Sequence, residues 1–62
     1  MVKFQRKGSN WEVIKHGEAV ALIRQAEADE QSDWGNVLLE HASGRIDRHH
    51  HVADAKADAA KL

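Results

Sequence analysis

The chain has 62 residues and no cysteine, and nine Lys and Arg residues against ten Asp and Glu residues give a net charge of −1. A chain of this length forms one small domain with a thin core, which excludes a large enclosed active-site cleft. Without disulfides or thiolate metal ligands, stability must come from packing or from a partner, which leaves room for association as a homodimer.

Residues 2–25 predict three short strands separated by glycine turns. β-Branched, aromatic and alternating residues favour strands at 2–6, 11–16 and 18–25. His16-Gly17 suits a two-residue hairpin loop, because glycine accepts the positive φ that such turns need. Residues 18–31 also suit a helix by propensity, so the sequence alone leaves a helix there as the alternative.

Residues 26–33 are polar and acidic, with no apolar periodicity, and predict a long exposed loop. The surrounding segment 25–44 has a net charge of −5, between +3 for residues 1–24 and +1 for residues 45–62. Such segregation creates a local field that can orient a charged partner, although an acidic segment can also be simply a solvated loop.

Strands are predicted again at 34–41 and 45–51, joined by a turn at Ala42-Ser43-Gly44. By alternation in the last strand, we expect Ile46 and His50 to face inward. The residues expected to face outward are Arg45, His49 and His51.

Residues 52–62 are rich in alanine and predict a helix. Its small-residue stripe must lie against the sheet, because an isolated helix of this length is only marginally stable. The stripe consists of Val52, Ala55, Ala59 and Leu62. We therefore expect a single domain, residues 1–62, of α+β class: an antiparallel three- or four-stranded β-meander packed against one C-terminal α-helix.

Enzymatic function is not expected. The chain has only three serines and no cysteine or tyrosine, so acyl-transfer machinery cannot be assembled with any specificity, and no glycine-rich phosphate loop appears. His49 and His51 would share a strand face and could hold a metal with His41 or Asp47 as a third ligand. An exposed histidine cluster also binds transition metals fortuitously, so we assign no metal site and no cofactor.

No membrane segment is expected either. The longest apolar run, Ala19–Ile23, falls far short of the roughly 18 residues needed to span a bilayer. The N-terminus lacks the apolar core of a signal peptide, which predicts a soluble cytoplasmic protein.

A strand meander followed by an arginine-bearing last strand and the tail Val52-Ala-Asp-Ala55-Lys56-Ala-Asp-Ala59-Ala60 resembles the three-strand-plus-helix DNA-binding domains of the AP2 type and of phage-integrase arms. The resemblance covers about residues 10–60. It implies phosphate and base contacts on the sheet face away from the helix. Arg24, Arg45 and His49 would make them, with His51 beside them on the last strand, and a DNA- or RNA-binding domain is our alternative hypothesis.

The leading hypothesis is a small non-catalytic module that binds a protein with a basic surface. Small size, charge segregation and the lack of catalytic groups are typical of the phage or mobile-element proteins that inhibit host machinery, anti-CRISPR proteins among them. The acidic side chains would select the partner, and a tryptophan would supply affinity. The predicted contact residues are Glu27, Asp29, Glu30, Asp33 and Trp34.

Overall fold

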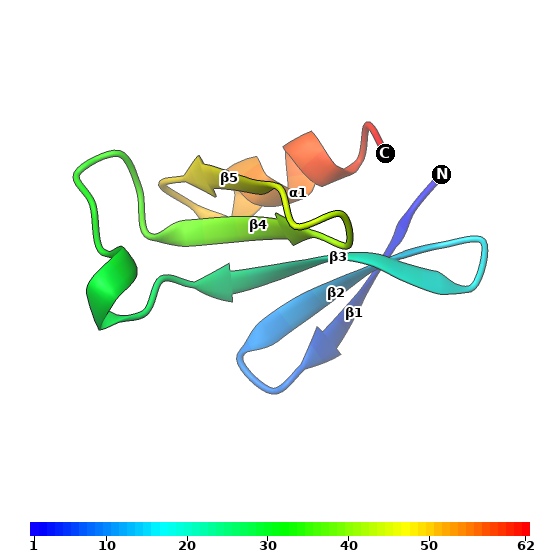
Figure 1. Cartoon of the computed structure of the whole chain (residues 1–62). Helices are drawn as coiled ribbons and strands as arrows, with labels where there is room; N and C mark the ends of the chain where they lie inside the picture. The colour runs from blue at the N-terminus through cyan, green and yellow to red at the C-terminus, as the bar shows by residue number, and fades with distance from the viewer.

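The computed structural model describes all 62 residues as one antiparallel sheet with a C-terminal α-helix (Figure 1). The strands pair in chain order: β1 (Lys3–Lys7), β2 (Asn10–Lys15), β3 (Glu18–Gln25), β4 (Val37–His41) and β5 (Ile46–His49). A 3-10 turn, η1 (Ala28–Glu30), lies between β3 and β4, and α1 (Val52–Ala59) follows β5. The α+β meander is confirmed. The sheet has five strands rather than three or four, because each predicted segment pairs with the next.

Residues 18–25 are a strand, so the helical alternative for 18–31 is wrong. β3 is the central strand and pairs with both β2 and β4. Its residues Ala21 and Ile23 are buried in the core. Pairing and burial on both sides outweigh the helix propensity of the alanines, which is a weak preference.

Several predicted boundaries differ from those observed by one residue, and three differ by two or more. β4 begins at Val37 rather than at residue 34, because the chain turns at Gly35, whose φ is +125°. β5 ends at His49, and α1 ends at Ala59 rather than at Leu62. The hairpin loop His16-Gly17 is confirmed: both residues have positive φ, +53° and +78°, as a tight two-residue hairpin requires.

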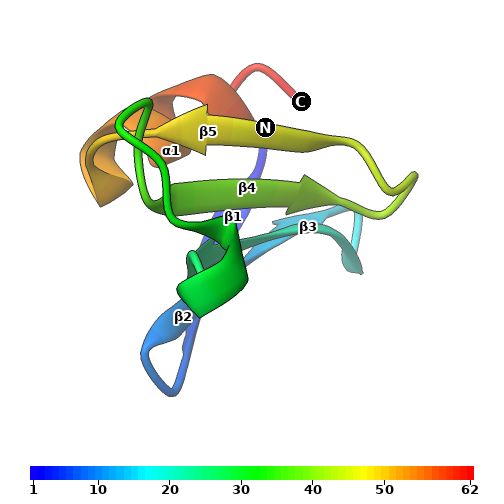
Figure 2. The ribbon, with the colours of Figure 1, turned by 60° about the vertical axis from the view of Figure 1, so that its left-hand side comes forward.

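The core lies between α1 and one face of the curved sheet, which wraps partly around the helix (Figure 2). The buried residues that the helix contributes to it are both alanines, so the helix backbone can approach β3, β4 and β5 closely, and Val52 packs against its edge. The buried residues of this core are Val13, Ala21, Ile23, Val37, Leu39, Ala55 and Ala59. Beside it, the Lys56 ammonium lies 3.5 Å from the centroid of the Trp11 ring, which extends the helix contact to β2.

The predicted orientation of β5 is inverted. Leu39 pairs with Asp47 and Val37 pairs with His49, and residues paired across an antiparallel sheet share a face, so Asp47 and His49 point to the helix side. Ile46 instead lies on the opposite face with 44% of its surface exposed. Alternation alone cannot choose between the two faces when polar side chains find partners inside, as these do.

The only α-helix has eight residues, and no helix is long and apolar enough to cross a membrane.

Candidate protein-interaction surface

The sheet face opposite α1 has its own covering layer. Leu38 on β4 is completely buried although it belongs to this second face, outside the main core cluster. Its cross-strand neighbours are Arg24 on β3 and Arg48 on β5. Both arginines bond to the segment of residues 26–36, here called the acidic loop. The acidic loop is therefore fixed over Leu38 and is not a free connection.

Arg24 provides one of these attachments. Its guanidinium forms a two-pronged ion pair with Glu30, Nη1 to Oε1 at 2.7 Å and Nη2 to Oε2 at 2.9 Å, and its Nε donates to Glu40 at 3.0 Å. The hydrogen bond from Arg24 and a backbone hydrogen bond at Glu27 lower the pKa of Glu30 to about 2, and the two carboxylates raise the pKa of Arg24. Planar bidentate pairing is the strong form of the ion pair, so it determines where η1 lies.

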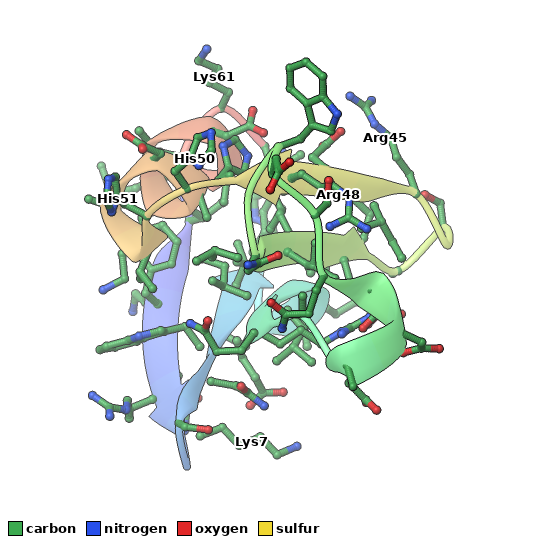
Figure 3. All side chains as sticks on the ribbon, turned by 90° about the vertical axis from the view of Figure 1, so that its left-hand side faces the viewer. Lys7, Arg45, Arg48, His50, His51 and Lys61 are labelled. Carbon is green, nitrogen blue, oxygen red and sulfur yellow. The ribbon has the colours of Figure 1, made fainter.

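Arg48 provides the other attachment. Its Nη1 donates to the carbonyl of Glu30 at 2.7 Å and to the carbonyl of Gly35 at 3.1 Å, joining the end of η1 to the last part of the acidic loop. Figure 3 shows Arg48 reaching from β5 toward this loop. Carbonyl acceptors leave the positive charge of Arg48 without a carboxylate partner.

Hydrogen bonds within the acidic loop complete its framework. The backbone N–H of Ala26 donates to the carbonyl of Asn36 at 2.7 Å and closes the loop at its base. The Asn36 side chain accepts from the N–H of Ser32 at 2.8 Å, and Ser32 Oγ accepts from the N–H of Trp34 at 3.2 Å. Gln31 Nε2 also donates to the carbonyl of Ala26 at 3.0 Å. The loop therefore holds its shape through its own polar groups.

Gly35 allows the loop to pass close to β5. A Cβ at this position would overlap the carbonyl group of His49, and the φ of +125° is one that residues with side chains rarely adopt. A glycine here lets the chain turn next to the strand and directs the preceding residue, Trp34, to the surface.

Trp34 is the most exposed large apolar side chain after the N-terminal methionine, with 80% of its surface accessible. The predicted contact residues share this loop but differ in availability. Glu27, Asp29 and Asp33 are exposed and form no ion pair. Glu30 is committed to Arg24, so its role is to hold the loop. The acidic loop thus carries a bare indole and three unpaired carboxylates.

The four residues of the nucleic-acid hypothesis do not form one surface. Arg24 lies on the loop side, where two carboxylates occupy its guanidinium. Arg45, 72% exposed, bonds to Asp47 on the helix side of β5. His49 also faces the helix side and bonds to Asp58 of α1 at 3.0 Å.

The histidines do not gather around a metal position. His41 Nε2 lies 2.8 Å from Asp47 Oδ2, and this hydrogen bond, followed by the one from Arg45, lowers the pKa of Asp47. His51 is exposed at the start of α1, whereas His49 is half-buried. No three metal-ligating side chains come together.

A surface hollow of about 350 Å³ around Leu22 lies toward the other end of β3, away from the acidic loop.

Sequence reasoning missed the residues that hold the loop, which are Leu38, Arg48, Gly35 and Asn36. Only Gly35 gave a local signal, because glycine favours a turn.

Comparisons with protein-family models, with curated proteins and with solved structures found no significant match.

Proposed function

We propose that this chain is a non-catalytic protein-binding module whose contact surface is the acidic loop with Trp34 at its centre. The observation that carries the proposal is the 80% exposure of Trp34 in a chain whose other aromatic residues, Phe4 and Trp11, pack against the core. An exposed tryptophan costs solvation free energy in the free protein and is among the commonest anchors of protein interfaces.

The rigidity of the acidic loop supports this proposal. Arg24 and Arg48 attach it to the sheet at Glu30 and Gly35, and its internal hydrogen bonds fix the path of the chain around Trp34. A loop that is ordered before binding loses less conformational entropy when it binds. Binding through Trp34 therefore starts from a shape that is already formed.

The charges of the acidic loop indicate the chemistry of the partner. Glu27, Asp29 and Asp33 have no internal cation, so their field extends into solvent. A partner with a basic surface around an apolar pocket would complement both features. The carboxylates would mainly speed association and select the partner, while burial of the indole would slow dissociation.

This chemistry also accommodates a phage or mobile-element inhibitor of host machinery. Basic grooves that hold nucleic acid are common on such machinery, and a rigid acidic surface competes for the same positive side chains. In that case binding of the module would displace nucleic acid from its partner.

The test is affinity capture from a nuclease-treated extract of the source cells, followed by direct binding to the purified partner. Trp34→Ala should weaken that binding about 30-fold or more, as loss of a central anchor does. Leu62→Ala is the matched apolar control, because Leu62 is 37% exposed and lies at the other end of the chain. Full binding by Trp34→Ala would refute the proposal.

A second pair of variants tests the charges. Neutralising Glu27, Asp29 and Asp33 to their amides should lower the association rate and its dependence on salt. Glu18→Gln with Asp54→Asn removes exposed, unpaired carboxylates elsewhere and should change neither quantity. Capture that disappears once nuclease is added would favour the nucleic-acid hypothesis instead.

A further inference from the structure

The surface around Trp34 contains its own charge complement. The acidic loop carries three exposed carboxylates that form no ion pair. A basic row runs along β5 and the turn after it, and Figure 3 shows its labelled members in chain order. The basic row consists of Arg48, His50 and His51, together with the exposed Arg45, which comes just before β5 and also contacts Asp47.

The two halves are in direct contact. Arg48 donates to the carbonyls of Glu30 and Gly35, and Gly35 lies against the backbone of His49 and His50. Trp34 immediately precedes Gly35 and is therefore located where the acidic and basic halves meet.

The basic row retains positive charge. Arg48 bonds to neutral carbonyls and forms no ion pair. Arg45 is 72% exposed, and the carboxylate it contacts, Asp47, is shared with His41. Arg48 and the three exposed carboxylates of the acidic loop thus have no ion-pair partner within the chain.

We propose that, when no other partner is bound, two copies of this chain associate about a two-fold axis near Trp34, with the acidic loop of each copy against the basic row of the other. A two-fold interface uses the same patch on both copies, so the patch must complement itself. A patch with an apolar centre and one half of each sign meets this condition. The net charge of −1 adds little overall repulsion between copies.

This inference rests on the proposed function, because it uses the same Trp34 surface and identifies one basic surface that can cover it. The second copy and any other partner would then compete. The free chain would keep its indole covered at high concentration and expose it on dilution or when a stronger partner arrives.

Sedimentation equilibrium of the purified full chain tests the inference. At about 0.02 M salt, where charge interactions are weakly screened, the average mass should rise from 6.9 kDa toward twice that value between about 10 µM and 1 mM protein. Trp34→Ala should remain at 6.9 kDa over the whole range.

Two charge-reversed variants make the test specific. The loop variant carries Glu27→Lys, Asp29→Lys and Asp33→Lys, and the row variant carries Arg45→Glu and His50→Glu. Each should be monomeric alone, because acidic loop and basic row now have the same sign. An equal mixture should dimerise, because both contacts between unlike variants again join opposite charges.

Glu18→Lys with Asp54→Lys is the matched control and should dimerise like the wild type. Circular dichroism of each variant verifies the fold, and a loop variant that unfolds is replaced by its Gln and Asn version, which should dimerise more weakly. A wild-type mass that stays at 6.9 kDa at about 1 mM, or a mixture of folded variants that stays monomeric, overturns the inference.

Failure of this inference is distinguishable from failure of the proposed function. A monomeric wild type whose capture of another protein depends on Trp34 overturns self-association alone. A dimeric wild type whose captured protein binds Trp34→Ala equally well overturns the proposed binding surface for that partner and leaves self-association standing.

Discussion

Replacing Leu38 by alanine tests whether the acidic loop is packed onto the sheet as a layer. Leu38 has no exposed surface, yet it lies outside the main core, with Arg24 and Arg48 on either side of it. Truncation would leave a cavity under the loop, because the two arginines and the hydrogen-bonded loop cannot collapse into it without breaking bonds.

The expected cost is about 2 to 5 kcal/mol, the usual range for a fully buried leucine. A domain of this size has about 3 to 9 kcal/mol of total stability, so the variant should be close to unfolding at room temperature. Leu22 lies on the same face of the sheet and is only half-buried, so Leu22→Ala should cost about 1 kcal/mol and is the matched control.

Urea denaturation followed by far-ultraviolet circular dichroism measures both costs in the same way. The midpoint of the Leu38 variant should fall well below that of the Leu22 variant, with a similar slope. Equal midpoints for the two variants would show that the loop does not seal Leu38, and the account of the loop as a rigid platform would fail.

Two further predictions concern the same loop. Gly35→Ala should displace the loop from β5 and cost on the order of 1 to 3 kcal/mol, because the new methyl group overlaps the strand backbone at an unfavourable φ; denaturation should detect this loss, and an unchanged midpoint would contradict it. Because the folded pKa of Glu30, about 2, is below its ordinary 4.5, its ion pair with Arg24 stabilises the fold fully above pH 4.5 and is lost as the pH falls toward 2. Replacing Glu30 by Gln should flatten this part of the acid titration of stability, and an unchanged acid profile would rule out the pair as its cause.

The prediction of the sheet succeeded where local rules decide the structure. The turn at His16-Gly17 needs two positive φ values, which a glycine-containing pair supplies, and strands 11–16 and 18–25 alternate around it. The small-residue stripe also predicted correctly that Ala55 and Ala59 would face the sheet. These features follow from interactions between residues near one another in the chain.

The orientation of β5 could not be read in this way. Alternation separates Ile46 from Asp47 and His49, but it does not say which set faces the helix. Asp47 and His49 point inward because His41 and Asp58, from two other elements, satisfy them there. Hydrophobicity alone therefore selected the wrong face.

The sequence by itself determined the alternating strands, the glycine turns, the alanine helix and the acidic character of the segment that contains Trp34, because each depends on neighbouring residues and their backbone preferences. Only the tertiary structure decided that this segment is a fixed layer with its indole exposed. That outcome depends on Leu38, Arg24 and Arg48, which come from three strands and meet only when the sheet is complete. Long-range pairing of this kind leaves no local signal in the chain.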